Sequence, residues 1–181
     1  SSINNASFEG SFATPSITDA ASAVLVLKNI TGKLNDENFT ASLVLQNLTS
    51  PTVICDFTGR IQASFLQEWF GLRNIAEVSG TLQADISLEG KLDLLKNKNT
   101  AQKVSTRGTI DLENINLLYG DARTPLRQLR GNLQFNNNDL ALSNLSATLG
   151  NSDFVVNGLF KNIVTFLFFD DQPVGVEADL K

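Results

Sequence analysis

The sequence predicts a mainly β protein: a curved antiparallel sheet, built as a repeated meander with a groove-like apolar face and a few short helices. Apolar and polar residues alternate over many short stretches, most regularly over residues 82–89. A period of two places apolar side chains on one face of a strand. Clusters of Asn, Asp and Gly separate these stretches, and such residues form the tight turns that join antiparallel strands. The pattern also recurs about a hundred residues along the chain.

The first third of the chain contains four predicted strands. Residues 7–12 form a weak edge strand, and the near-continuous apolar run 21–30 predicts a strand covered on both faces. A turn at 34–38 leads to the alternating stretch 39–48. After Pro51 a further strand begins, over residues 53–62. We therefore expect a run of adjacent antiparallel strands.

The middle of the chain changes period. Phe65, Trp69, Phe70 and neighbouring apolar residues recur at three- and four-residue spacing over 64–75, which predicts a short amphipathic helix. Residues 78–89 show the cleanest strand alternation. Residues 91–106 are basic and poor in strand formers, so they form either a protruding loop or a short helix with a linker.

The last part of the chain repeats the strand pattern. Alternation returns over 108–118, and residues 131–162 contain three further alternating stretches separated by Asn-, Asp- and Gly-rich turns. Apolar spacing over 162–169 predicts a second short helix, and residues 174–180 predict a final strand. The whole chain is expected to form one β-rich domain.

Three glycine pairs indicate an internal duplication. Gly32 and Gly131, like Gly59 and Gly158, lie 99 positions apart, and Gly10 and Gly108 lie 98 apart. The order of turn, strand and helix after these glycines is also alike, which favours duplication over chance. The domain, residues 1–181, is therefore predicted to hold two tandem units, at about 8–90 and 107–181, joined by a loop at 91–106.

Composition excludes several classes of function. The chain is 42% hydrophobic and 18% charged with a net charge of −5, which argues against a nucleic-acid partner and makes anionic lipid headgroups poor electrostatic partners. No stretch has the roughly 20 apolar residues of a membrane span. The chain begins without Met or signal-peptide features. These features suggest a fragment of a longer protein, and any anchor or targeting segment would then lie outside this sequence. We expect the fragment to be monomeric.

Catalytic chemistry is poorly supported. The chain has no His, which removes the usual general base and most catalytic zinc sites. Its single Cys55 cannot form an intrachain disulfide and is expected to be a small buried apolar residue. The carboxylate pairs at 36–37 and 170–171 lie in predicted turns, where Asp is favoured for its backbone hydrogen bonds. We predict no enzyme activity, no cofactor and no metal centre.

Two polar patterns have ordinary explanations. Five Asn-x-Ser/Thr sequons follow from a composition rich in Asn, Ser and Thr. Trp69 with its neighbouring aromatics could stack on a sugar, but at helical spacing such residues more often pack on a sheet. A carbohydrate-binding, adhesin-like domain therefore remains an alternative.

Several short motifs resemble a known family. These are GTIDLENI (108–115), RGNLQF (130–135), DLALSNL (139–145), GNSDFVVNG (150–158) and PVGVEADL (173–180). Together they look like the C-terminal region of AsmA-family proteins, particularly the long Bacteroidetes forms, and more loosely like TamB. The resemblance covers residues 108–180 best and residues 32–59 more faintly.

The resemblance implies an envelope protein of a Gram-negative bacterium, anchored in the inner membrane, with a periplasmic β groove. Family members are implicated in phospholipid transport toward the outer membrane and in outer-membrane assembly. No catalytic residues come with the family. It implies lipid acyl chains as ligands, and a long groove as the site.

The residues expected to face lipid are the inward positions of the alternating strands. Each acyl CH₂ removed from water contributes about 0.8 kcal/mol, so an apolar groove would hold a chain without directional contacts. The alternative is a structural or assembly module in which the same face is a closed core. The lipid-facing candidates are Leu82, Ala84, Ile86, Leu88, Leu133, Phe135, Leu140, Leu142, Phe154 and Val156.

Overall fold

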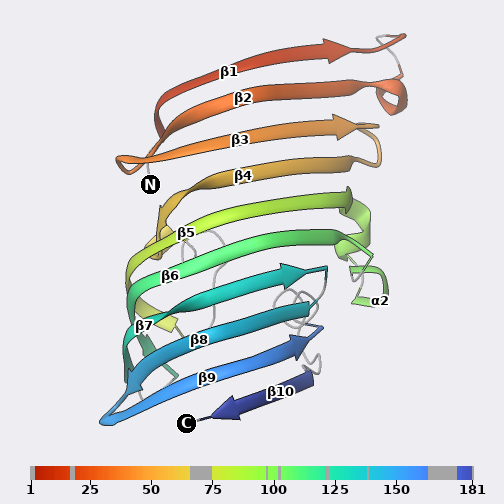
Figure 1. The fold of residues 1–181 in the computed structure, drawn as a ribbon. Helices are drawn as coiled ribbons and strands as arrows, with labels where there is room; N and C mark the ends of the chain where they lie inside the picture. The colour runs from red at the N-terminus through yellow and green to blue at the C-terminus, as the bar shows by residue number, and fades with distance from the viewer. Residues whose placement is uncertain are drawn as a thin grey trace.

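A computed structural model shows one ten-stranded antiparallel sheet in which every strand pairs with its neighbours in the sequence (Figure 1). It describes residues 3–16, 19–65, 75–96, 98–101, 103–120, 123–137, 139–162 and 175–180. The strands are β1 (Ile3–Ala13), β2 (Val24–Leu34), β3 (Glu37–Gln46), β4 (Thr52–Gln62), β5 (Ile75–Lys91), β6 (Ser105–Tyr119), β7 (Thr124–Asn136), β8 (Asp139–Leu149), β9 (Ser152–Lys161) and β10 (Gly175–Leu180).

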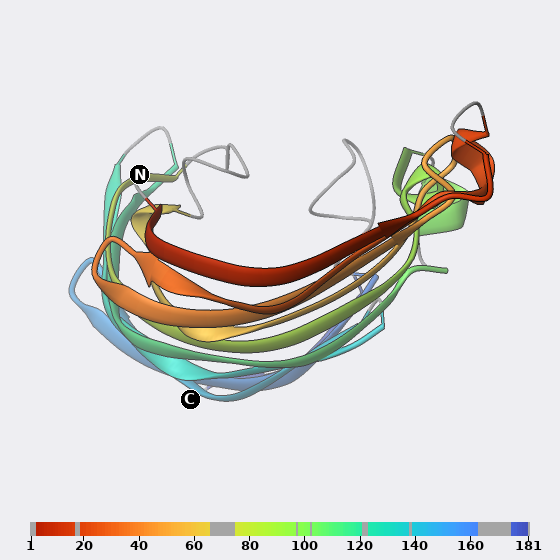
Figure 2. The same cartoon turned by 90° about the horizontal axis from the view of Figure 1, so that it is seen from above.

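The sheet is curved and open. Seen from above, its strands form a trough with β1 and β10 at the two edges (Figure 2). The predicted fold class, a curved antiparallel meander with a few short helices, is confirmed. Besides the helical residues Ser64 and Phe65, the described segments include the 3₁₀ turns η1 (Ala20–Ser22) and η2 (Leu92–Lys96), and the helix α2 (Lys98–Ala101).

Tight turns with positive φ join several hairpins. Asn35 and Asp36 have φ values of 47° and 69° and connect β2 directly to β3. Both central residues of a type I′ hairpin turn need positive φ, which Asn and Asp tolerate better than other non-glycine residues. In the two-residue β8–β9 turn only the first central residue, Gly150, has a positive φ, of 62°. The predicted turns at these positions are therefore explained by backbone conformation.

Asparagine also bends the strands. Asn114 in β6 and Asn144 in β8 have φ near 50° and lie at shifts in the pairing register, as does Gln128 in β7. One extra residue with this conformation makes a bulge, which bends a strand and increases its twist. These bulges occur on three adjacent strands, β6, β7 and β8. Much of the Asn content therefore shapes the backbone.

The apolar run 21–30 is less buried than the sequence predicts. From Val24 onward it forms β2, but none of the residues 24–33 is buried, so the prediction of a strand covered on both faces is wrong. The sheet is a single layer in the described chain, and Val24 and Val26 lie half-exposed on the face opposite Leu25 and Leu27. An unbroken apolar run indicates a buried strand only where a second layer covers it.

The predicted helices are only partly within the described residues. Ser64 and Phe65 are helical and Ile75 already belongs to β5, while residues 66–74, including Trp69, and nearly all of 162–169 lie outside the described residues. The stretch 91–106 contains η2 and α2, which agrees with the short-helix alternative.

The repeated glycines occupy strands five positions apart in the sheet. Gly10, Gly32 and Gly59 lie on β1, β2 and β4, whereas their counterparts Gly108, Gly131 and Gly158 lie on β6, β7 and β9. The two predicted units thus coincide with β1–β5 and β6–β10 of one continuous sheet. Duplication itself stays a prediction.

Candidate binding trough

Apolar side chains form rows that cross the sheet. Directly paired residues of antiparallel strands share a face. Following the pairs from strand to strand therefore gives the residues of each row. One row runs Ile30, Ala41, Phe57, Ile86, Gly108, Phe135, Leu140, Phe160 and Val176, from β2 to β10. A neighbouring row runs Gly32, Phe39, Gly59, Ala84, Ile110, Leu133, Leu142, Gly158 and Ala178. We call this concave apolar face, with the residues paired to it, the trough.

Glycines in these rows make room for aromatic neighbours. A Cβ at Gly59 would lie 2.7 Å from the Cβ of Phe39, which is paired with it. Phe39 also stacks on Phe57, with ring centroids 5.9 Å apart and an angle of 15° between the planes. At Gly108, φ is 131° and a Cβ would meet the Asp85 carbonyl oxygen at 1.9 Å. A side chain at either position would therefore displace the strand or its neighbour.

All ten residues predicted to face lipid lie on the trough face. Leu82, Ala84, Ile86 and Leu88 of β5 pair toward β6 through Leu112, Ile110, Gly108 and Thr106. The candidates on β7, β8 and β9 join them through the rows above and through the pairs Leu145–Val156 and Ala147–Phe154. That these side chains bind lipid is a proposal, since the register fixes only their shared face.

The prediction omitted several residues of the same face. Phe39, Phe57, Ile110, Leu112 and Phe160 pack against the buried residues of the trough. Each lies in an alternating stretch of the sequence. Assigning every second residue of each strand to the same face would therefore have found them. Phe65 carries a different signal, the helical spacing over 64–75 that predicts aromatic residues packed on the sheet, and its burial agrees with that prediction.

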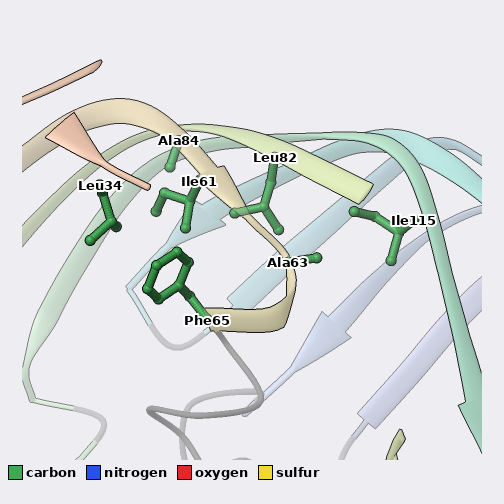
Figure 3. Packing of buried hydrophobic residues seen from close by; sticks show 7 residues of the cluster. All are labelled: Leu34, Ile61, Ala63, Phe65, Leu82, Ala84 and Ile115. Atoms are coloured by element: carbon green, nitrogen blue, oxygen red, sulfur yellow. The ribbon is translucent and has the colours of Figure 1, made fainter. Parts of the chain in front are cut away.

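One end of the trough is filled by side chains. Phe65 is 1% exposed and packs with six buried neighbours in one cluster (Figure 3). Its neighbours come from β2, β4, β5 and β6 and from the residue that follows β4: Leu34, Ile61, Ala63, Leu82, Ala84 and Ile115. The chain beyond β4 turns back over the sheet and places this ring on the concave side (Figure 3). This end is therefore a closed core.

The central part of the trough is more open. Leu27, Leu43, Cys55 and Leu88 form a cross-strand row, and each of these residues is only half-buried. Burial raises the pKa of the Cys55 thiol, and the neighbouring Asp56 carboxylate raises it further. Such a thiol is neutral at physiological pH. The predicted burial of Cys55 is thus only partial, although the side chains paired with it are apolar.

The opposite end of the trough is walled by the short helical segments. Figure 2 shows η1, η2 and α2 gathered beyond the strand ends on that side. Ala101 and Val104 are buried there, and Val104 covers Gly90 closely enough that a Cβ would lie 3.1 Å from its side chain. The trough is therefore bounded at both strand ends and open between them.

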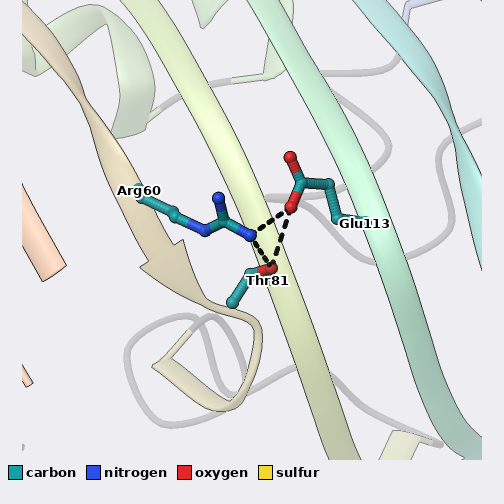
Figure 4. Close-up of polar contacts among 3 residues, drawn as sticks. All are labelled: Arg60, Thr81 and Glu113. Atoms are coloured by element: carbon teal, nitrogen blue, oxygen red, sulfur yellow. Dashed lines mark hydrogen bonds and ion pairs between the residues drawn. The ribbon is translucent and has the colours of Figure 1, made fainter.

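The convex face carries a polar ladder. Arg60 forms an ion pair with Glu113 across β5, and Thr81 donates a hydrogen bond to the same carboxylate (Figure 4). Asp56 accepts hydrogen bonds from Ser42 at 2.9 Å and from Ser87 at 2.6 Å. These pairs tie neighbouring strands on the solvent side. The convex face is thus mainly polar, apart from a short apolar row formed by Val26, Val44 and Ile54.

Shallow depressions occur on this polar face. One, of about 300 Å³, is lined mainly by hydroxyl-bearing residues around Asp56, and another, of about 520 Å³, lies around Thr109 and Gln134. Within the described ranges, no group of three potential metal-ligating side chains is close enough to hold an ion. No described helix is long and apolar enough to cross a bilayer.

The fold and the trough together define a class: an open, single-layer antiparallel β trough with an apolar interior and a polar exterior. No protein family, curated protein or solved structure matches this chain. The proposals below therefore depend on the geometry of the trough and on the residues themselves.

Proposed function

We propose that the trough binds lipid acyl chains and that the protein acts as a non-enzymatic lipid-transfer module. The observation that carries this proposal is the central row, in which Leu27, Leu43 and Leu88 are apolar, concave and half-exposed. Monomeric proteins seldom expose large contiguous apolar patches, and those that do commonly use them for binding. A flexible hydrocarbon ligand suits a surface without directional polar contacts.

The length of the trough suits sliding rather than enclosure. Neighbouring strands lie about 4.8 Å apart, so ten strands span roughly 43 Å across the sheet. One leaflet of a bilayer core is about 15 Å thick, which is the reach of one acyl chain. The open row itself crosses β2 to β5 and ends where Leu88 pairs with Thr106, so it offers room for one acyl chain. Movement farther along the trough would follow the two longer rows. The headgroup would stay in solvent, because the protein is net acidic and offers anionic groups no attraction.

The cellular setting follows from the resemblance to AsmA-family proteins. We propose that the module works in the periplasm of a Gram-negative bacterium, as part of a longer protein anchored in the inner membrane. Its task there would be phospholipid transfer or outer-membrane assembly. The apolar concave face supports this reading because transfer needs a continuous surface and no catalytic group.

Cys55 provides a direct test. Its thiol lies in the open row beside Leu43 and Leu88, so bound hydrocarbon should shield it. Alkylation of Cys55 by a maleimide is measured with and without dioleoylphosphatidylcholine vesicles. We expect at least a tenfold slower reaction in their presence, together with phospholipid in an organic extract of the reisolated protein.

Ser87 is the matched control, because it precedes Leu88, the partner of Cys55, and lies on the opposite face of the sheet. Ser87 is exposed and convex, so Ser87→Cys in a Cys55→Ser background reports accessibility of the polar side. Its alkylation rate should not change with vesicles. Protection at both positions would indicate indiscriminate adsorption, and protection at neither would refute acyl-chain binding.

A structural or assembly module is the second candidate, supported by the closed cluster around Phe65. Such a module would bind no lipid and would show no protection of Cys55. The carbohydrate-binding alternative depended on Trp69, which lies outside the described residues.

A further inference from the structure

The edge strand β1 is unusually open for its length. All eleven of its residues are exposed, and β2 is its one partner strand among the described residues. Edge strands are normally protected by Lys, Pro or short length, since unpaired backbone groups accept another strand. Between Ile3 and Ala13 the one charged residue is Glu9, and there is no Pro. By contrast, β10 at the other edge is described over six residues and carries Glu177 and Asp179.

The exposed sequence of β1 is nearly palindromic. Phe8-Glu9-Gly10-Ser11-Phe12 reads almost alike in both directions about Gly10. Phe8 and Phe12 lie on the concave face with Gly10 and are 62% and 60% exposed. From Ser7 to Ala13 the strand has no bulge of its own, because its irregular residue, Asn5, precedes this stretch. The stretch is therefore a regular, self-complementary edge.

We propose that β1 pairs with β1 of a second copy, about a two-fold axis through Gly10 and perpendicular to the sheet. Antiparallel pairing of this kind sets Phe8 against Phe12 of the second copy, twice. It also sets Glu9 against Ser11, so no like charges face each other. Aromatic cross-strand pairs stabilise antiparallel strands, whereas like-charged pairs destabilise them. The two concave faces then lie on the same side, and the troughs join into one.

The two-fold arrangement is favoured over head-to-tail joining. Pairing of β1 with β10 would match an eleven-residue edge to six described residues and place two carboxylates beside Glu9 on the convex side. Isologous pairs are also the commonest form of homo-oligomer, and they close after two copies. The sequence alone predicts a monomer, because the self-complementarity of residues 8–12 becomes meaningful only with β1 at the edge of the described sheet.

The test is the oligomeric state of the 181-residue chain by sedimentation velocity between 1 and about 300 μM. We expect a reversible monomer–dimer equilibrium. Phe8→Lys with Phe12→Lys places lysines opposite each other at both pairs and should raise the dissociation constant at least about 100-fold. Phe8→Lys with Phe12→Asp places opposite charges there instead. It should restore dimers at low salt and lose them at high salt.

The other edge supplies the control. Val176→Lys changes an exposed apolar residue of β10, 53% exposed, and should leave dimerisation unchanged. All variants alter exposed side chains, so their circular-dichroism melts should stay close to that of the unmodified chain. A chain that stays monomeric throughout, or a double-lysine variant that still dimerises, overturns the proposal. Dimers broken by Val176→Lys, or growth beyond dimers, would instead indicate β1–β10 joining. The assay contains no lipid, so its result is independent of the proposed lipid binding.

Discussion

Two leucines on one strand lie in different parts of the trough, one in the closed end and one in the open row. Leu82 and Leu88 both lie on the concave face of β5, but Leu82 is 2% exposed in the Phe65 cluster, whereas Leu88 is half-buried beside Cys55. Leu→Ala substitutions in packed cores cost about 3–5 kcal/mol, from lost transfer free energy and the cavity left behind. For a chain of this size, about 2–4 °C of melting temperature is lost per kcal/mol. Leu82→Ala should therefore lower the melting temperature by about 6–20 °C.

Leu88→Ala should behave differently. Its side chain is already half in water and leaves no enclosed cavity, so we expect a loss of about 1 kcal/mol and a shift of at most about 4 °C. If acyl chains lie in the open row, losing contact with about two CH₂ groups should weaken phospholipid binding roughly tenfold. The assays are calorimetric melting and titration with a pyrene-labelled phosphatidylcholine. Equal, large losses of stability at both positions without a change in lipid binding would show that the whole trough is a closed core.

Three further predictions concern the thiol, the bulges and the strand edge. Because the pKa of Cys55 is raised above its ordinary value of 9.0, the alkylation rate without lipid should keep rising beyond pH 9. The folded state should also lose stability above that pH, since the unfolded thiol ionises first. Asn144→Val should cost about 1–2 kcal/mol in urea unfolding, because φ of 51° strains a β-branched residue, whereas Asn144→Gly should be nearly neutral. Hydrogen bonding to Lys161, and then its charge, lower the pKa of Glu177 below 4.5, which an NMR titration should show. Any stability from this pair is lost as pH falls through that lowered pKa, and Glu177→Gln should barely change melting at neutral pH, because both side chains are largely in solvent.

Alternation predicted the strands and their apolar face because the period of two is a local property. Residues 82–89 alone were sufficient to assign Leu82 and Leu88 to one side. The difference in burial between them was beyond the sequence, because it arises from Phe65, which folds back from the end of β4. Likewise, the sequence assigned Asn clusters to the turns between strands, whereas Asn114 and Asn144 bend strands from within, and among the described residues eight of the twelve non-glycine residues with positive φ are Asn. A backbone role of this kind becomes visible only with the dihedral angles.

The origin of the curvature bears on how the trough could bind. The bulges at Asn114, Gln128 and Asn144 bend β6, β7 and β8 through backbone conformation, and their side chains are exposed. Nothing in that bend depends on what occupies the concave face. On the convex side, Asp56 and the Arg60–Glu113 pair tie the strands together independently of any ligand. A preformed surface loses little conformational freedom on binding, so more of the free energy of apolar burial remains as affinity. If the bulges set the shape, Asn144→Val should weaken phospholipid binding as well as stability, although position 144 lies on the exposed side of the strand. Asn144→Gly should leave both unchanged, and a valine variant that binds normally would show that the bend is not needed.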